Sequence, residues 1–531
     1  MIESLEFDNE SVLDYSLNLA NEYLQNIDYK QRKKIGQFFT PKKNAVFMAD
    51  CVNIYQKKIL LLDPGSGTGI LSAAVCERIL LESNHPVSLS IVAYENDEKI
   101  RPLLKDTFDA CKQKFSERGH VLEYNIEPEN FLSKNSLELR FGESNFSFNE
   151  NNNFFDMVIS NPPYYKMGKE SLQSIALDDY VFGQPNIYSL FMILSAKMVK
   201  PGGDIVFITP RSFCSGFNYK KIREWFIKNT SFQKFHIFES RKKVFCEEKI
   251  HQETIIFHTL KESPRTDNKV NISLSLDRKF ELKNSIRVSH SDIIYNKKCE
   301  SFIRLPSSEL ELKIIEIVDS WSQTLQDIGL NISTGPIVDF RKVESLQETI
   351  SDEFSVPLLW MQNLIDGKIV WPNEKNHNNQ AIEINKKTIN TLLPIKNYVL
   401  LRRVTSKEQK RRLCATGFNK NDFKKFKYIG LENHLNYIYK VEGELSEVEM
   451  TGLIVLLNTK IIDIYFRILN GNNQVNATEM RTLPMPTIEK IDLIGRKFKG
   501  KKFEIGYEMD CNVAELLEIN LEVIDEIYAS I

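Results

Sequence analysis

The sequence predicts an α/β fold for its N-terminal half, with a mostly parallel twisted sheet and helices on both faces. Strand-like apolar runs alternate with helical segments through this half, which is typical of parallel sheets. Two of these runs end in polar loops rich in Gly or Pro, at Asp63–Gly69 and Asn161–Tyr164. Because ligands bind at the carboxyl ends of strands in open α/β sheets, both loops are candidate binding segments.

Composition limits the class of protein before any motif is considered. A chain of 531 residues is long enough for two or three domains with full cores. It carries no apolar run long enough for a membrane span, and its acidic start does not resemble a signal peptide, so we expect a cytoplasmic protein without membrane contact. The eight cysteines are scattered, which favours reduced thiols over disulfides or zinc, and no metal is expected. The net charge of −2 requires any nucleic-acid surface to be local.

The first segment before the glycine-rich loop is expected to be helical. Leu13, Leu17 and Ala20 recur at helical spacing within residues 1–35, which predicts a packing helix. Thr40 is a good N-cap and Pro41 a good first residue for a helix that reaches Val52. The free N–H groups at such a helix start can hold a carboxylate, although a capped helix without a ligand is the simpler interpretation.

The run Ile59–Leu62 leads into Asp63–Gly69, and a helix is predicted over residues 70–81. Glycines let the backbone approach a ligand at a helix N-terminus, and no Gly-Lys-Ser/Thr follows, so this is not the phosphate loop of ATPases. Asp63 beside the glycines suits a cationic amino-acid ligand such as S-adenosylmethionine. Glu95, which ends the next strand at 90–94, suits hydrogen bonds to ribose hydroxyls, with a solvated loop acid as the alternative.

The loop Asn161-Pro162-Pro163-Tyr164 follows a buried strand. Two prolines fix φ and remove two N–H donors, so the loop offers carbonyl acceptors from a stiff frame. Asn161 adds a side-chain carbonyl and Tyr164 adds a flat ring, a combination that suits a planar substrate with an NH2 group. The alternative is a Pro-Pro turn that only ends a strand.

The N-terminal half contains further, less specific patterns. Asn130, near the end of a third strand at 124–126, could contact an adenine amine edge with Phe131 packed on the ring, or the pair could be a surface Asn beside a core Phe. Further elements are predicted as a helix at 187–198, a turn at 201–203 and strands at 204–209, 235–238 and 254–258.

Gly36–Pro41, Asp63–Gly69 and Asn161–Tyr164 resemble three successive motifs of the gamma-class DNA adenine-N6 methyltransferases of type II restriction–modification systems. The resemblance implies a Rossmann-like S-adenosylmethionine-dependent core and a mixed α+β C-terminal target-recognition domain. It implies a site-specific enzyme that transfers a methyl group to the N6 amine of an adenine flipped out of duplex DNA, by direct attack and without a metal.

The resemblance also implies residue roles. Thr40 would contact the methionine carboxylate, Asp63, Gly65, Gly67 and Gly69 would surround the methionine, and Glu95 would hold the ribose. Asn130, Phe131 and Phe191 would line the cofactor adenine pocket, although the family usually carries Asp where Asn130 stands. Asn161, Pro162, Pro163 and Tyr164 would receive the flipped adenine, with Phe245 as the second aromatic ring.

The expected organisation is an N-terminal helical segment (1–30), a catalytic domain (31–260), a linker with connecting strands (261–300) and a target-recognition domain (301–531). Between Lys396 and Lys427, eleven Lys or Arg residues stand against two acids, a local formal charge of +9 that suits phosphate contact. A solvated basic loop is the alternative. The residues expected to contact DNA are Arg402, Arg403, Lys410, Arg411, Arg412, Asn473 and Gln474.

Two other functions remain open at this stage. The same Asn-Pro-Pro-Tyr chemistry serves enzymes that methylate RNA or a protein glutamine, and a DNA-recognition subunit without catalysis would also fit. The sequence carries no recognisable nuclease motif, so a separate restriction endonuclease is the expected partner, with an orphan methylase as the alternative.

Overall fold

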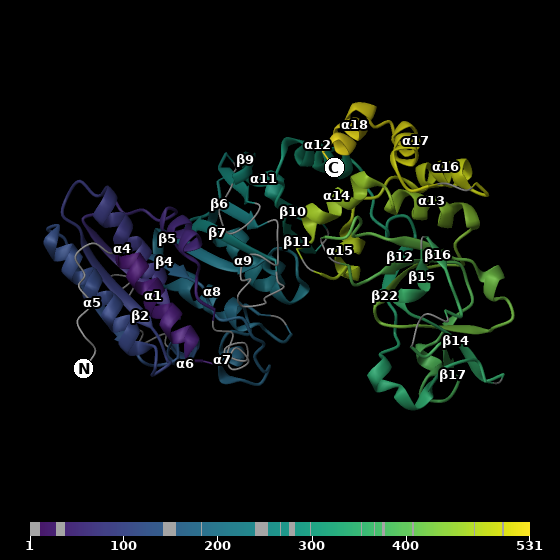
Figure 1. Cartoon of the computed structure of the whole chain (residues 1–531). Helices are drawn as coiled ribbons and strands as arrows, with labels where there is room; N and C mark the ends of the chain where they lie inside the picture. Colours follow the sequence, from purple (N-terminus) through teal and green to yellow (C-terminus); the bar gives the residue numbers. More distant parts are fainter. Residues whose placement is uncertain are drawn as a thin grey trace. The chain divides into compact units, whose positions relative to one another are not determined.

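The structure is a computed structural model of the whole chain. It describes residues 11–27, 38–141, 155–181, 183–238, 253–265, 267–275, 282–297, 299–351, 353–365, 367–373, 378–405, 408–471, 473–501 and 504–530, with the side chains of 137–141 left aside. Contacts divide the chain into two compact units. The first comprises Met1–Asn296 and Ser301–Ser307, and the second Lys297–Glu300 and Ser308–Ile531 (Figure 1).

The first unit is built on one large sheet, in which the described residues form nine strands in the order β3-β2-β1-β4-β5-β7-β6-β8-β9. Neighbours from β3 to β5 are parallel, β7 runs antiparallel to β5 and β6, and β9 runs antiparallel to β8. The strands are β1 (Lys58–Pro64), β2 (Ser88–Tyr94), β3 (Val121–Glu127), β4 (Phe155–Ser160), β5 (Val199–Pro210), β6 (Ser231–Phe238), β7 (Thr254–Leu260), β8 (Lys269–Ser275) and β9 (Leu282–Ser289). This topology confirms the predicted fold class.

Helices pack on both faces of this sheet. One face shares a core with α1 (Val12–Gln25), α3 (Lys42–Ala49), α4 (Ile70–Glu82) and α5 (Arg101–Glu117). Because side chains alternate along a strand, Leu62 and Val158 point to the other face, where α8 (Ile187–Met198) packs against β1, β4 and β5. Further α-helices among the described residues of this unit are α6 (Phe131–Phe141), α7 (Leu172–Ala176), α9 (Lys220–Asn229) and α11 (His290–Ile293).

Two expectations about local structure were wrong. The helix after Pro41 spans Lys42–Ala49 with Pro41 as its N-cap, so Thr40 does not cap it. Residues 201–203 continue β5 instead of forming a separate turn. The stretch 261–300, expected to contain connecting strands, contributes β8 and β9 to the sheet: their alternate apolar residues are buried, while the polar ones between them give the stretch its polar composition.

The second unit combines two small sheets with a helical core. One sheet has the order β12-β22-β19-β20 and the other β13-β17-β14-β21-β18, with β15-β16 as a separate hairpin. Its strands are β12 (Leu330–Thr334), β13 (Leu346–Gln347), β14 (Ser355–Leu359), β15 (Leu364–Ile365), β16 (Lys368–Ile369), β17 (Ala381–Glu383), β18 (Leu393–Pro394), β19 (Tyr398–Arg402), β20 (Ala415–Phe418), β21 (Tyr428–Leu431) and β22 (Leu435–Lys440). This mixed α+β composition agrees with the prediction for the C-terminal part.

The helices of the second unit gather around a shared apolar core. They are α12 (Glu309–Asp319), α13 (Glu447–Leu457), α14 (Lys460–Leu469), α15 (Ala477–Thr482), α16 (Ile488–Phe498), α17 (Tyr507–Leu517) and α18 (Leu521–Ala529). The last two of these helices are separate because Glu518 adopts a left-handed conformation with φ of 60° that ends α17.

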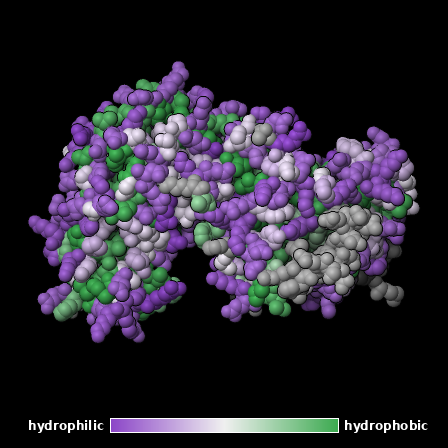
Figure 2. Space-filling model, turned by 180° about the vertical axis from the view of Figure 1, so that it is seen from behind, coloured by the Kyte–Doolittle hydropathy of each residue, from purple (hydrophilic) through white to green (hydrophobic). Residues whose placement is uncertain are grey.

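Hydrophilic residues predominate on the face drawn in Figure 2, with hydrophobic residues scattered between them. Within the part of the chain that the structure describes, every helix is too short or too polar to cross a membrane.

Candidate active site

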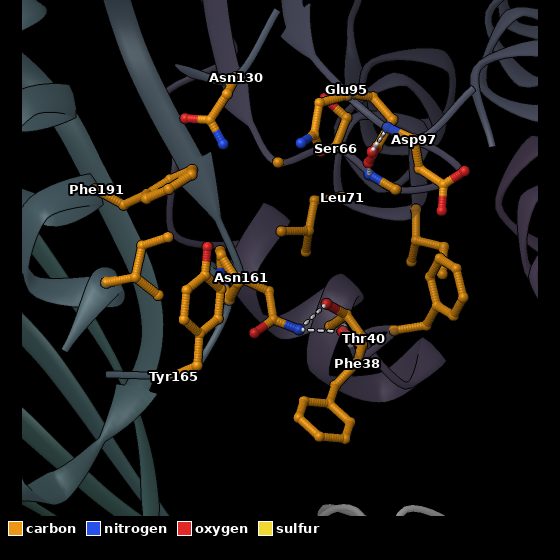
Figure 3. Close-up of a pocket in the computed structure, with 17 residues that line it drawn as sticks. Phe38, Thr40, Ser66, Leu71, Glu95, Asp97, Asn130, Asn161, Tyr165 and Phe191 are labelled. Atoms are coloured by element: carbon orange, nitrogen blue, oxygen red, sulfur yellow. Dashed lines mark hydrogen bonds between the residues drawn. The ribbon is translucent and has the colours of Figure 1, made fainter. Parts of the chain in front are cut away.

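The two loops singled out in the sequence meet at the carboxyl edge of the sheet. They follow β1 and β4, which are adjacent, and the strand order reverses between them, as expected for a ligand crevice. Ser160 Oγ donates to the Pro64 carbonyl at 2.8 Å and joins the two loops. Beside them lies a cavity of about 340 Å³ (Figure 3). The residues expected to bind a ligand that line this cavity are Thr40, Gly65, Gly67, Glu95, Asn130, Asn161, Pro163 and Phe191.

The glycine-rich loop needs glycine for conformation and for close approach. Gly67 has φ of 57°, and a Cβ there would stand 2.9 Å from the ring of Phe39. Gly69 has φ of 84° at the N-cap of α4, where a Cβ would stand 2.9 Å from Leu104. Gly69 therefore serves helix packing, and it is not among the described residues that line the cavity.

Asp63, which the sequence predicted to contact the ligand, does not line the cavity. Its carboxylate is 1% exposed, accepts a hydrogen bond from Ser72 Oγ at 2.6 Å at the start of α4, and is not among the described cavity-lining residues. Burial raises the pKa of Asp63 to about 7, against the lowering effect of the Ser72 hydrogen bond. The structure thus corrects the expectation of direct ligand contact, because the N-terminus of α4 draws the carboxylate inward.

Glu95 lines the cavity at the end of β2. Its Oε2 accepts from the Gly67 N–H at 2.9 Å and its Oε1 from the Asp97 N–H at 2.8 Å. Burial raises the pKa of this carboxyl, while the two N–H donors lower it. Each carboxylate oxygen still has acceptor capacity, so Glu95 can accept from two hydroxyl groups of a ligand.

Asn161 is held in one orientation by its neighbours. Its Nδ2 donates to the Phe38 carbonyl at 2.9 Å and to Thr40 Oγ1 at 3.1 Å (Figure 3). Its Oδ1 accepts from the Tyr164 hydroxyl at 2.7 Å, and that hydroxyl also lies 2.8 Å from the Ile208 carbonyl. An amide oxygen has two acceptor lone pairs, so one remains for a further donor.

Tyr164 and Pro162 lie outside the described lining of the cavity, so the loop contributes Asn161 and Pro163 to it directly. The Tyr164 ring faces that of Phe38, with centroids 6.5 Å apart and planes inclined by 22°. Burial raises the pKa of Tyr164 well above its usual range, so its hydroxyl stays protonated.

The opposite end of the cavity is aromatic. Phe191 from α8 lines this end of the cavity. The ring of Phe131, a residue that is 2% exposed, packs against the ring of Phe191 with centroids 5.1 Å apart. Phe131 therefore supports the wall and does not contact the cavity, contrary to the prediction. Asn130 lines the cavity, but its Oδ1 accepts from the N–H groups of Leu132 and Ser133, both at 3.1 Å. This leaves the Nδ2 donor of Asn130, not its carbonyl, for a ligand.

Several lining residues were not expected from the sequence, namely Phe38, Phe39, Ile70, Leu71, Asn96, Asp97, Tyr165 and Ile187, whereas Ser66 lies in the predicted segment Asp63–Gly69. Tyr165 was detectable, since it follows the predicted loop directly, and its ring stands between Asn161 and Phe191 in Figure 3. Phe245, expected as a second aromatic ring, lies outside the described residues.

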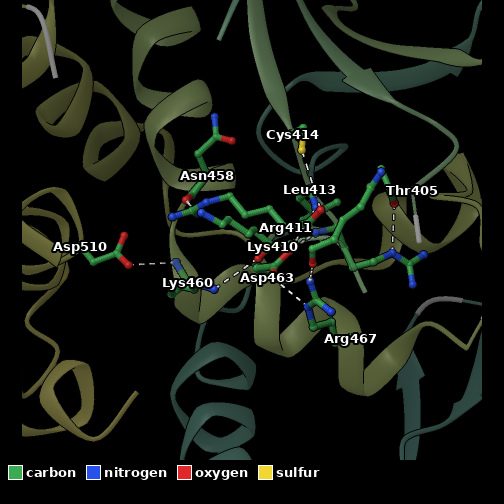
Figure 4. A network of polar contacts seen from close by, with 12 residues as sticks. Thr405, Lys410, Arg411, Leu413, Cys414, Asn458, Lys460, Asp463, Arg467 and Asp510 are labelled. Atoms are coloured by element: carbon green, nitrogen blue, oxygen red, sulfur yellow. Dashed lines mark hydrogen bonds and ion pairs between the residues drawn. The ribbon is translucent and has the colours of Figure 1, made fainter. Parts of the chain in front are cut away.

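The basic stretch between Lys396 and Lys427 contains both a buried arginine that is bonded within the protein and lysines that are exposed to solvent. Arg412 is 1% exposed, and its Nε and guanidinium NH2 donate to Thr405 Oγ1 at 3.0 Å and Asn470 Oδ1 at 3.1 Å. Its backbone N–H donates to Asp463, and Arg411 donates to the Asn458 carbonyl in the same network (Figure 4). The prediction that Arg412 contacts DNA was wrong, because internal acceptors enclose it.

The other residues expected to contact DNA differ in exposure. Arg402 and Arg403 are half-buried and donate to the backbone carbonyls of Leu364 and Asn433. Gln474 is exposed and accepts from Arg403 at 3.3 Å, and Asn473 is exposed beside it. Among the residues of this stretch that the structure describes, the exposed lysines are Lys396, Lys410, Lys424, Lys425 and Lys427.

This chain is similar in sequence to known restriction–modification methyltransferases. Residues 52–245 match the family model described as Eco57I restriction-modification methylase. The type II methyltransferase M.PstI of Providencia stuartii is 32% identical over 500 residues, which cover 93% of this chain and 96% of that protein. The type II methyltransferase M.BsuBI of Bacillus subtilis is 32% identical over 494 residues, which cover 92% and 95%.

Among solved structures, a DrdV–DNA complex aligns with 93% of this chain and 60% of its own, at 12% identity and a TM-score of 0.48. The similarity to these two methyltransferases extends over more than nine tenths of the chain and therefore over both units. The chain therefore belongs to the type II DNA methyltransferases of restriction–modification systems.

Proposed function

We propose that this protein transfers a methyl group from S-adenosylmethionine to the N6 amine of an adenine that is flipped out of a specific duplex DNA sequence. The observation that carries the proposal is the orientation of Asn161 at the cavity edge. Both hydrogens of its Nδ2 are engaged, by Phe38 and Thr40, so Oδ1 is held as the acceptor for an incoming amine.

The cavity suits S-adenosylmethionine. Phe191 gives an aromatic wall for an adenine ring, and Glu95 offers two carboxylate oxygens for ribose hydroxyls. Thr40 and the start of α3 would hold the methionine carboxylate, because free N–H groups at a helix N-terminus favour an anion. When bound, this cofactor supplies a methyl group on a cationic sulfur, which is the electrophile of the reaction.

The protein's part in the reaction is orientation. Asn161 Oδ1 and the Pro162 carbonyl would accept the two hydrogens of the adenine amine, so that the nitrogen lone pair faces the methyl carbon. The nitrogen held in this way would take the methyl group that the cofactor supplies, the carbon–sulfur electron pair would stay on sulfur, and the excess proton would leave the nitrogen for solvent. Tyr164 remains neutral and donates to Asn161 without competing for the second lone pair of Oδ1.

The ring of Tyr164 supports a flipped base. Duplex DNA hides the adenine amine, so the base has to leave the stack before reaction. The rings of Phe38 and Tyr164 have centroids 6.5 Å apart and planes inclined by 22°, and we propose that the flipped base packs against this aromatic pair. Phe245 remains a prediction as a further aromatic contact.

DNA recognition is assigned to the second unit. We propose that residues 301–531 are the target-recognition domain and residues 31–260 the catalytic domain. Lys424, Lys425 and Lys427 are exposed within the basic stretch and can neutralise phosphates. Asn473 and Gln474, exposed next to Arg403, can read base edges through their amides.

The test is transfer of a labelled methyl group from S-adenosylmethionine to duplex DNA, RNA and protein, followed by nucleoside analysis of the product. We expect N6-methyladenine in duplex DNA from the wild type and none from Asn161→Ala, which should still bind the cofactor. Asn125→Ala, an exposed asparagine on β3, is the matched control and should keep wild-type activity.

Label in RNA or in protein glutamine, instead of DNA, would replace this proposal with one of the alternative substrates. Cofactor binding without methylation of any substrate would favour a recognition subunit without catalysis. Wild-type turnover by Asn161→Ala would remove Asn161 from the reaction.

A further inference from the structure

The hydroxyl of Thr40 has a proton that can be donated to a ligand in the cavity. Thr40 Oγ1 accepts from Asn161 Nδ2 at 3.1 Å, so one of its lone pairs is used. A threonine hydroxyl also carries one proton to donate. Thr40 is 5% exposed, and among the described residues no acceptor for this proton is recorded. Because Thr40 lines the cavity, an acceptor on a bound ligand can receive it.

We propose that Thr40 connects the carboxylate of the bound cofactor to the acceptor that orients the target amine. This inference rests on the proposed function, since it takes the cavity as the S-adenosylmethionine site. The hydroxyl of Thr40 donates to the cofactor carboxylate and accepts from Asn161 Nδ2, while Asn161 Oδ1 accepts from the adenine amine.

All donors in this chain point the same way. The amine donates to Oδ1, Nδ2 donates to Oγ1, and Oγ1 donates to the carboxylate, so the negative charge of the cofactor polarises each bond in turn. Hydrogen bonds arranged in series strengthen one another in a site of low dielectric constant. A carboxylate bound at Thr40 therefore makes Oγ1 a better acceptor and Oδ1 more negative, which favours the target amine.

Other contacts of Asn161 do not replace this route. The second hydrogen of Nδ2 goes to the Phe38 carbonyl at 2.9 Å, a backbone group whose acceptor strength does not depend on the cofactor. Tyr164 donates to Oδ1 at 2.7 Å and leaves its second lone pair for the amine. Thr40 is thus the described contact of Asn161 that both lines the cavity and carries an uncommitted proton.

The consequence is a measurable coupling between the two binding sites. A coupling between equilibria is reciprocal, so the cofactor must tighten the flipped adenine by the same factor by which the adenine tightens the cofactor. We expect about a five-fold effect, the lower end of the usual range of such couplings. A ligand without a carboxylate should bind with no such effect.

The experiment measures the dissociation constant of a duplex that carries the unmethylated target site, alone and with saturating S-adenosylhomocysteine, and then the dissociation constant of S-adenosylhomocysteine with and without that duplex. 5′-Methylthioadenosine, which lacks the amino-acid carboxylate, is the comparison ligand. In the wild type and in Thr40→Ser we expect about five-fold reciprocal tightening with S-adenosylhomocysteine and none with methylthioadenosine. In Thr40→Val, whose side chain has the same shape, we expect the factor to fall to about one.

Thr107→Val is the matched control. It removes another buried hydroxyl near the glycine-rich loop, which donates to the Thr68 carbonyl at 2.8 Å, and the coupling should persist. Undiminished coupling in Thr40→Val, or equal coupling by methylthioadenosine, would overturn the inference while leaving the proposed function intact. A wild type that neither binds S-adenosylhomocysteine nor methylates DNA would instead overturn the proposed function.

Discussion

The Asp63 carboxyl should make the stability of the first unit depend on pH, and Asp63→Asn should remove that dependence. The pKa of Asp63 is raised from 3.8 to about 7, chiefly by burial beneath the glycine-rich loop. An acid with a raised pKa in the folded state holds its proton there after the unfolded chain has lost it. Stability is therefore highest below pH 4 for this group, falls as pH rises through 4 to 7, and levels off above that window.

The size of this change in stability follows from the pH interval between the unfolded-state and folded-state pKa values of Asp63. Each pH unit well between the two pKa values lowers the free energy of unfolding by about 1.4 kcal/mol, and the slope lessens near the upper pKa, so the loss between pH 5 and pH 7 is about 2 kcal/mol. The amide in Asp63→Asn carries no charge and keeps an oxygen that can accept from Ser72, as Asp63 does at 2.6 Å. The variant should therefore gain stability relative to the wild type by this amount over the same interval.

The assay is urea unfolding of the wild type and the variant at pH 5, 6, 7 and 8, read as the difference between the two proteins at each pH. Taking the difference cancels the titration of all other groups. Asp106→Asn, which removes an exposed carboxylate on α5, is the matched control and should follow the wild-type slope. A difference between Asp63→Asn and the wild type that does not change with pH would refute the argument from burial.

Three further predictions follow from the placement of aromatic and basic residues. Replacing Lys424, Lys425 and Lys427 together by Ala should weaken DNA binding and make the slope of log affinity against log salt less steep by up to about three, and an unchanged slope would take them out of the interface. Arg412→Ala should instead lower the free energy of unfolding by about 1–3 kcal/mol, because it leaves buried acceptors unpaired. Denaturation midpoints measure this loss, and full stability with weakened DNA binding would contradict the structural role of Arg412. Phe191→Ala should raise the dissociation constant for S-adenosylhomocysteine by about five-fold or more in calorimetry, since stacking of a base on an aromatic ring is worth about 1–3 kcal/mol, and an unchanged constant would place the adenine elsewhere.

The elements whose boundaries are marked by local chemistry were predictable. The helix predicted over 187–198 is α8 residue for residue, because a continuous apolar run follows Asn186, whose side chain accepts from the Tyr188 N–H. The strands before Asp63 and Asn161 were also expected, since each apolar run stops at a glycine or proline loop. Both loops were expected at the carboxyl ends of their strands, and the strand order of the sheet, in which β1 and β4 are adjacent, brings them together.

The sequence by itself therefore determined the class of the core and the segments that line the cavity, because period, glycine and proline act over a few neighbouring residues. Only the tertiary structure decided what each charged or polar side chain does. Arg412 looked like a phosphate contact until Asp463 and Asn470, about fifty residues later in the chain, were found to enclose it. Likewise Thr40 looked like a helix cap until Asn161, 121 residues away, was found to donate to it. A polar side chain takes its role from its partner, and here that partner comes from a distant part of the chain.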